Sequence, residues 1–74
     1  MLSVGPYLRE MRLRRGASFE EIARSTRVAQ RYLVALEAED FSQLPPPAFT
    51  RGFIRAYCQT LGESPEEALV LYEQ

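Results

Sequence analysis

Few residues of this sequence could carry out covalent chemistry. Its other polar and aromatic residues are suited to binding. The chain has no histidine and a single cysteine, Cys58. Without histidine, neither a His-based metal site nor a His general base is possible. A lone cysteine cannot form an internal disulfide, which fits a reducing, cytoplasmic compartment. We therefore expect no enzyme activity, no cofactor and no metal, and a buried, inert Cys58 thiol.

The charged residues are unevenly distributed along the chain. The net charge is only −1, and all nine basic residues are arginine. Seven of these arginines lie in residues 1–36 against three glutamates, whereas residues 37–74 hold two arginines against seven acidic residues. Arginine is the better bidentate partner for phosphate or carboxylate. The first half of the chain is therefore basic and the second acidic, although genome composition alone also explains a chain that uses arginine and no lysine.

The apolar residues of positions 47–62 indicate a helix with an unusually wide apolar face. At about 100° per residue, they cover about half of the helix circumference, more than the ~100° arc that a single buried stripe needs. These apolar residues are Phe49, Phe53, Ile54, Tyr57, Cys58 and Leu61. Ile54, Tyr57 and Leu61 form the centre of the arc and are assigned to the core. Phe49 at its edge and Phe53 on its shoulder are therefore candidates for a surface that docks another protein.

Four further helices are expected, over residues 3–15, 19–25, 29–38 and 65–73. Gly16 and Gly62 follow helical segments and are expected to end them. The pattern Ser-x-x-Glu, which forms a capping box, occurs twice, at Ser18–Glu21 and at Ser64–Glu67. Five helices without a strand pattern predict an all-α fold, a single domain over residues 1–74 in which the second and third helices form a helix-turn-helix.

The core positions follow from the apolar spacing of each segment. Leu8 and Met11 are expected to face inward from the first helix, and residues 39–47 to form a loop held to the core by Phe41 and Leu44. The other expected inward positions are Phe19, Ile22 and Ala23, then Val28, Leu36 and either Tyr32 or Leu33, and finally Leu69 with Ala68 or Tyr72.

Two segments resemble a known family. They are D-F-x-x-L-P over residues 40–45 and F-x-R-G-F-I-R-x-Y over residues 49–57. With the helix-turn-helix before them, they are similar to the N-terminal cytoplasmic domain of RodZ-type bacterial cell-shape proteins, which belong to the Cro/C1-repressor-like helix-turn-helix group. The resemblance covers nearly the whole chain and implies a five-helix Cro/C1-type helix-turn-helix domain.

The resemblance also implies a partner. RodZ-type domains bind the actin-like filament protein MreB, and the family's contact positions on the fourth helix align with Phe49 and Phe53, beside which we place Tyr57 on the same helix. Arg24, Arg27 and Arg31 would meet acidic residues of the filament. The wider group pairs an arginine of the first helix with a glutamate of the third, which here are Arg12 and Glu37.

RodZ-type proteins are longer than this chain. We therefore expect it to be the N-terminal part of a protein anchored in the inner membrane by a downstream transmembrane helix, with this segment itself monomeric and making no membrane contact.

Two other interpretations remain open. A helix-turn-helix can present its second helix to the major groove of DNA, and the residues placed to do so are Arg24, Arg27, Ala29, Gln30 and Arg31. Against DNA binding stand the slightly acidic net charge and Glu20, whose carboxylate would face the phosphates. The third interpretation is a plain structural domain whose wide apolar arc is covered by the loop and the last helix.

Overall fold

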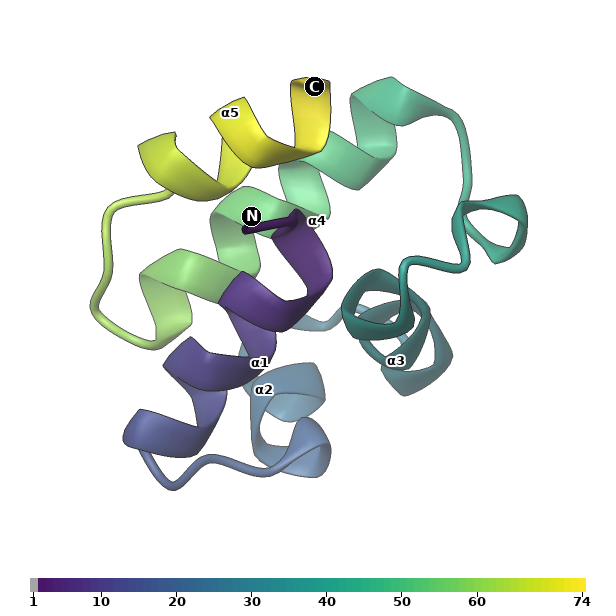
Figure 1. Ribbon diagram of the computed structural model, residues 1–74. Coiled ribbons are helices and arrows are strands. Elements are labelled where there is room, and N and C mark those ends of the chain that lie inside the picture. The colour runs from purple at the N-terminus through teal and green to yellow at the C-terminus, as the bar shows by residue number, and fades with distance from the viewer. Residues whose placement is uncertain (1) are drawn as a thin grey trace.

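The computed structural model describes residues 2–74, and within them every regular element is helical (Figure 1). The elements are α1 (Val4–Arg14), α2 (Phe19–Thr26), α3 (Gln30–Ala38), the short 3-10 helix η1 (Phe41–Gln43), α4 (Pro47–Thr60) and α5 (Glu66–Glu73). The predicted all-α, five-helix fold is confirmed, and the α-helix boundaries agree with the expected ones to within two residues.

The helices pack so that each covers the apolar side of at least two elements. Helix α1 packs on α3 and α5, α2 packs on α3 and α4, and α4 also packs on α5. Helices α2 and α3 form the helix-turn-helix, and α3 with η1 lies at the right of the view in Figure 1, below the first turns of α4, to which the η1 segment connects. This arrangement places α3 and the N-terminal half of α4 on one side of the molecule.

The core draws residues from all five α-helices and from the turn before α3. Its buried side chains are Val4, Leu8, Met11, Ile22, Val28, Leu33, Leu36, Ile54, Tyr57, Cys58, Leu61 and Ala68. Burial of each large apolar side chain contributes about 1.5–3 kcal/mol. The alternative inward residues are now resolved: Leu33 is fully buried while Tyr32 is half-buried, and Ala68 is fully buried while Leu69 and Tyr72 pack at the edge.

Glycine ends α1 and α4, as the sequence predicts. Gly16 and Gly62 both have left-handed backbone conformations, with φ of 64° and 74°, which glycine adopts without a steric penalty. After each glycine the next amide donates back to a carbonyl in the last helical turn: Ala17 N to Arg12 O at 3.1 Å, and Glu63 N to Cys58 O at 2.9 Å. These hydrogen bonds satisfy carbonyls that would otherwise lack a partner.

The turn between α2 and α3 is fixed without glycine. Arg27 follows α2 with a φ of 63°, a conformation that costs a non-glycine residue about 1–2 kcal/mol. The hydroxyl of Thr26 donates to Ile22 O at 2.7 Å and accepts from Val28 N at 3.1 Å. The turn is therefore stabilised by a threonine side chain and by the burial of Val28 behind it.

Only the first of the two predicted capping boxes forms. The Ser18 hydroxyl accepts from Glu21 N at 3.1 Å, and the Glu21 carboxylate accepts from Ser18 N at 2.8 Å. At the second, Pro65 rather than Ser64 is the cap of α5, and no side chain caps that helix. The prediction was wrong there because Ser64 lies one residue too early, so its hydroxyl reaches only Glu66 N, at 3.5 Å.

The segment before α4 is more ordered than a plain loop. Residues 41–43 form η1, and Leu44 is half-buried against the core. Phe41 is exposed and meets the core only at its rim, where its ring lies edge-on to Tyr72 with centroids 5.8 Å apart. Thr50 anchors the start of α4, since its buried hydroxyl donates to Pro45 O at 3.0 Å.

Candidate functional site

An exposed aromatic surface connects α4 to α3. The ring of Phe53 stacks on that of Tyr32, with centroids 5.4 Å apart and planes 22° from parallel. The guanidinium of Arg31 lies 4.7 Å from the centroid of the same Tyr32 ring, within the range of a cation–π contact. Phe49, one turn before Phe53 on α4, is 62% exposed. We call Phe49, Phe53, Tyr32 and Arg31 the aromatic surface.

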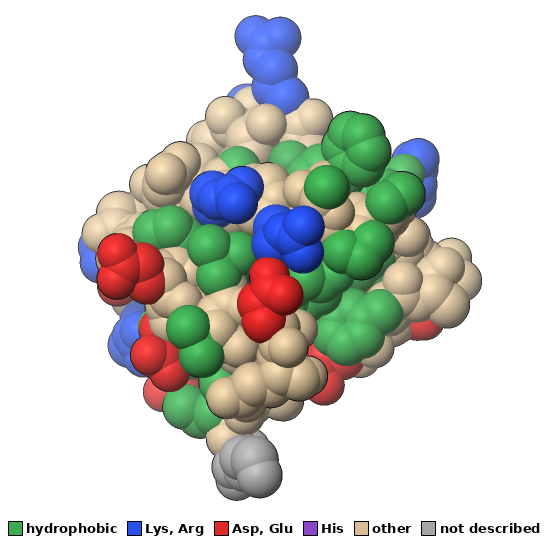
Figure 2. Space-filling model, turned by 90° about the horizontal axis from the view of Figure 1, so that it is seen from above, with side chains coloured by type: hydrophobic (Ala, Val, Ile, Leu, Met, Phe, Trp, Pro, Cys, Tyr) green, Lys and Arg blue, Asp and Glu red, His purple; other side chains and the backbone are tan. Residues whose placement is uncertain are grey.

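The aromatic surface joins two groups of residues that the sequence analysis treated separately. Phe53 belongs to the predicted phenylalanine pair, Phe49 and Phe53. Arg31 belongs to the predicted arginine group, Arg24, Arg27 and Arg31. The ring of Tyr32 contacts both Phe53 and Arg31. Figure 2, the view from above Figure 1, shows that hydrophobic side chains also gather on the side of the molecule where α5 and the first turns of α4 lie, with basic and acidic side chains beside them. An apolar patch rimmed by charges has the composition expected of a protein-binding surface.

Phe49 and Phe53 are exposed to different degrees. The Phe49 side chain is largely uncovered by the rest of the domain, whereas Phe53 is half-buried by its contacts with the core and with Tyr32. The interpretation in which the whole apolar arc of α4 is covered is therefore wrong for Phe49. It is partly right for Phe53.

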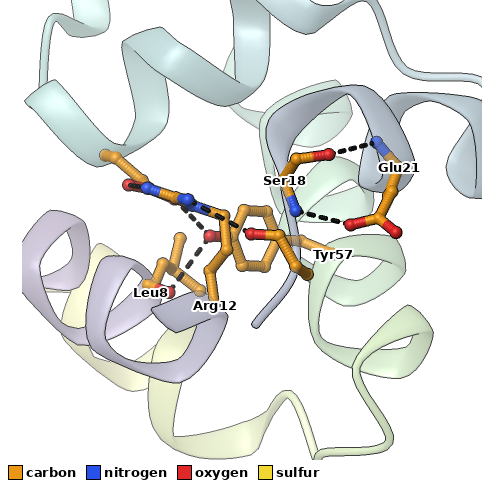
Figure 3. A network of polar contacts seen from close by, with 7 residues as sticks. Leu8, Arg12, Ser18, Glu21 and Tyr57 are labelled. Carbon is orange, nitrogen blue, oxygen red and sulfur yellow. Dashed lines mark hydrogen bonds and ion pairs between the residues drawn. The ribbon is translucent and has the colours of Figure 1, made fainter. Parts of the chain in front are cut away.

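Tyr57 does not belong to this surface, and its assignment as a protein contact is corrected. Its side chain is fully buried. Its hydroxyl lies 3.0 Å from Leu8 O (Figure 3) and donates its single proton to the carboxylate of Glu37. Burial and the neighbouring Glu37 carboxylate raise the pKa of Tyr57 well above its usual value. Since the ring lies at the centre of the apolar arc, it turns inward to the core rather than outward to a partner.

The same network contains the Arg12–Glu37 pair. Arg12 Nε lies 2.8 Å from Glu37 Oε2, and Arg12 Nη2 lies 3.1 Å from Oε1, a bidentate contact. The side chains are only 13% and 6% exposed, and the hydrogen bond to Glu37 raises the pKa of Arg12. Arg12 also lies 4.1 Å above the ring of Phe19 and donates to Ala17 O. The pair therefore ties α1 to α3 inside the fold and offers nothing to an external ligand.

The arginine group crosses the turn between α2 and α3. Arg24, Arg27, Gln30 and Arg31 are exposed, and Ala29 is half-buried. None of the three arginines forms an ion pair within residues 2–74. By contrast, Arg15 is paired with Glu63 at 2.7 Å and Arg51 with Glu73 at 3.4 Å. Of these arginines, Arg31 is the one whose guanidinium lies against the aromatic surface, at the Tyr32 ring.

Two residues of interest were not predicted to belong to a surface. Tyr32 was left as a core alternative to Leu33, although an aromatic residue beside the first arginine of α3 is a signal for stacking. Val34 is 43% exposed. On the helical wheel, Val34 lies about 100° from Leu33 and about 160° from Leu36, away from the side on which these two leucines are buried, so the helical period could have identified it.

The other features of the described chain are a buried thiol and a second pocket. Burial raises the pKa of the Cys58 thiol to about 11, so the nucleophilic thiolate is scarce at neutral pH. Within residues 2–74, no three His, Cys, Asp or Glu side chains gather as metal ligands. A separate open pocket of about 340 Å³ between the α1–α2 turn and the end of α4 is lined mainly by small and polar side chains. None of the helices in this part of the chain is long and apolar enough to span a membrane.

These features define a helix-turn-helix domain with an exposed aromatic surface. The chain belongs to the helix-turn-helix domain family HTH_25, whose model matches residues 7–68. It is similar to the cytoskeleton protein RodZ of Streptococcus pneumoniae, with 40% identity over 55 residues. That match covers 74% of this chain and 20% of the relative, so the chain spans about a fifth of the length of RodZ.

A solved structure supports the same fold. The chain superposes on YmfM, a membrane protein from Staphylococcus aureus proposed to bind DNA, with a TM-score of 0.86 and 29% identity. The superposition covers 97% of this chain and 88% of the YmfM chain. The resemblance to RodZ-type helix-turn-helix domains is therefore confirmed by a family, a relative and a structure.

Proposed function

We propose that this domain is the protein-binding part of a RodZ-like cell-shape protein and that it binds the actin-like filament protein MreB through Phe49, Phe53 and the arginines Arg24, Arg27 and Arg31. The single observation that carries the proposal is the 62% exposure of Phe49 on an ordered helix. An aromatic ring exposed on a rigid helix keeps apolar surface in contact with water, which is unfavourable. A bound partner would remove that surface from water. The similarity to the cytoskeleton protein RodZ supports a non-enzymatic, cytoskeletal role.

The arrangement of the surface fits recognition of a protein filament. Phe49 supplies a ring free to enter a pocket, which is the usual form of an interface hot spot. On the neighbouring α3, the Arg31 guanidinium lies 4.7 Å from the centroid of Tyr32, the ring that stacks on Phe53. Arg24, Arg27 and Arg31 form no ion pair within residues 2–74. They would raise the association rate with an acidic filament surface. The domain acts as a monomer in this proposal, and the longer protein is anchored in the inner membrane by a downstream transmembrane helix.

Co-sedimentation with MreB filaments tests the proposal. Phe49→Ala should weaken binding by about 2 kcal/mol, about thirtyfold in Kd, as expected for a hot-spot ring. The fold should survive because the Phe49 side chain contributes little to the core. Val70→Ala is the control, since Val70 is 54% exposed on α5 and should leave binding unchanged. Equal co-sedimentation of wild type and Phe49→Ala would remove Phe49 from the site.

DNA binding is a second candidate, and one observation favours it. Arg24, Arg27, Gln30 and Arg31 are all exposed at the turn and at the start of α3, where a helix-turn-helix contacts base edges and phosphates. This candidate predicts a gel shift that falls steeply with salt and is lost in Arg31→Ala. Absence of a shift with genomic fragments at low salt would exclude it.

A further inference from the structure

The outward face of α3 carries a shallow groove of about 280 Å³. Its lining includes Arg31, Tyr32, Val34, Ala38, Asp40 and Gln43. The groove follows α3 and is bounded at its far end by the residues leading into η1. Val34, at its middle, is 43% exposed. We call this feature the α3 groove.

The chemistry of the α3 groove differs from that of a DNA-reading helix. DNA readers place hydrogen-bonding side chains along the helix that enters the major groove. Here, Val34 and Ala38 lie exposed on the outward face, and with Ala35 they form the part of the lining that has no side-chain donor or acceptor. Arg31 is the nearest cation, and its guanidinium lies against the Tyr32 ring. The face of α3 is thus suited to an apolar ligand rather than to base edges.

The two ends of the α3 groove carry opposite charges. Arg31 lies at one end, exposed and without an ion pair in the described chain. Asp40 lies at the other, exposed, with its carboxylate accepting from the Ser42 hydroxyl at 2.8 Å. At 1.5 Å per residue, the helix between Arg31 and Ala38 is about 10 Å long. That length fits two turns of a partner helix with an acidic residue near Arg31 and a basic or amide residue near Asp40.

The α3 groove is continuous with the aromatic surface. Tyr32 belongs to both, since its ring stacks on Phe53 and also lines the groove. We propose that the α3 groove extends the filament-binding surface from α4 onto α3 and takes a short amphipathic segment of the filament protein. An apolar side chain of that segment packs on Val34 and an acidic one pairs with Arg31. This inference rests on the function proposed above and names the second element that the partner contacts.

Two matched substitutions test the α3 groove with the chain and polymerised MreB. Val34→Glu places a charge in the groove, and Val70→Glu makes the same change at a position of α5 that is exposed to a similar degree, 54% against 43%. Both variants should keep the helical circular dichroism and melting temperature of the wild type to within a few degrees, because both positions are exposed helix sites. Val34→Glu should weaken co-sedimentation about tenfold or more, and Val70→Glu should not.

The outcomes separate this inference from the proposed function. If Phe49→Ala loses binding to MreB while Val34→Glu binds like the wild type, the proposal for the α3 groove is overturned and the proposed function stands. Absence of binding by the wild type would overturn both. Sedimentation equilibrium that shows wild-type self-association abolished by Val34→Glu would identify a second copy as the occupant. A gel shift lost in Val34→Glu would identify DNA. Either result would overturn the assignment to the filament protein.

Discussion

The hydroxyl of Tyr57 in α4 donates a hydrogen bond to the carboxylate of Glu37 in α3, although the two residues lie 20 positions apart. The same hydroxyl reaches Leu8 O of α1 at 3.0 Å. Glu37 also holds Arg12 of α1. One polar cluster therefore fixes the position of α4 relative to α1 and α3, and α4 carries the exposed Phe49. The orientation of the aromatic surface depends on this buried cluster.

The Tyr57 hydroxyl should be worth more to stability than an ordinary tyrosine hydroxyl. Tyr57→Phe keeps the buried ring and removes a hydrogen bond to a carboxylate, so we expect a loss of about 2 kcal/mol in the free energy of unfolding. Tyr72→Phe is the matched control because the Tyr72 hydroxyl makes no hydrogen bond within residues 2–74. Urea unfolding of both variants measures the difference. Equal losses would contradict the role assigned to the cluster.

Alkaline pH should destabilise the wild type partly through Tyr57. The pKa of Tyr57 is raised in the folded state, chiefly by burial, from a reference value of 10.0. Above pH 10 the unfolded chain loses this proton while the folded chain keeps it, so the free energy of unfolding falls as pH rises. The contribution is complete below pH 10 and absent in Tyr57→Phe. Urea midpoints measured from pH 9 upward should therefore fall less steeply in Tyr57→Phe than in Tyr72→Phe, which retains Tyr57.

Removal of one member of the Arg12–Glu37 pair should be costly. The pair is nearly buried, and an uncompensated charge in that setting costs about 3–5 kcal/mol. We expect Arg12→Met to destabilise by about 3 kcal/mol, and Arg12→Met combined with Glu37→Gln to destabilise by less than the sum of the single changes. Additive losses in this double-mutant cycle would show that the two side chains are not coupled. Arg14→Met, at an exposed pair with Glu10, should change stability by less than about 1 kcal/mol.

The two Ser-x-x-Glu patterns should respond differently to the same substitution. Ser18→Ala removes a formed capping box and should cost about 1 kcal/mol. Ser64→Ala removes only a 3.5 Å contact to Glu66 N and should cost a few tenths of a kcal/mol at most. Thermal unfolding at neutral pH compares the two. Equal losses would mean that Ser64 caps α5 in solution.

The serine patterns also show what the sequence can and cannot predict. Helix number, helix ends and most of the core follow from periodicity, glycine stops and caps, all of which are local. The second capping box failed because Pro65 took the cap position, a choice that depends on how α5 joins α4. The stacking of Tyr32 on Phe53 was missed for the same reason: residues 21 positions apart meet only once α3 and α4 are packed.

Gly5 and Gly52 should give opposite results when changed to alanine. A Cβ at Gly5 would overlap the Glu37 carbonyl and lie 2.7 Å from Glu39 Cγ, because α1 crosses the end of α3 there. The Gly5 amide also donates to Glu39 Oε2 at 2.8 Å. We expect Gly5→Ala to destabilise by about 1–3 kcal/mol. At Gly52 in α4 a Cβ meets nothing within 4 Å, so Gly52→Ala should stabilise by about 0.5–1 kcal/mol. Urea unfolding decides the signs, and a stabilising Gly5→Ala would contradict the close crossing.

The stack of Phe53 on Tyr32 should contribute energy beyond the burial of either ring. Aromatic pairs of this geometry are worth about 0.5–1.5 kcal/mol. Phe53→Leu and Tyr32→Leu keep much of the apolar volume and remove the stack, so each should destabilise by about 1 kcal/mol. The double variant should lose less than the sum, by the energy of the stack, in urea unfolding. Because the Arg31 guanidinium lies 4.7 Å from the centroid of the Tyr32 ring, Tyr32→Leu should also weaken co-sedimentation with MreB although Tyr32 is only half-exposed. If the stability losses of Phe53→Leu and Tyr32→Leu are additive and Tyr32→Leu binds MreB like the wild type, Phe49 is the only residue of the aromatic surface that retains a role in binding.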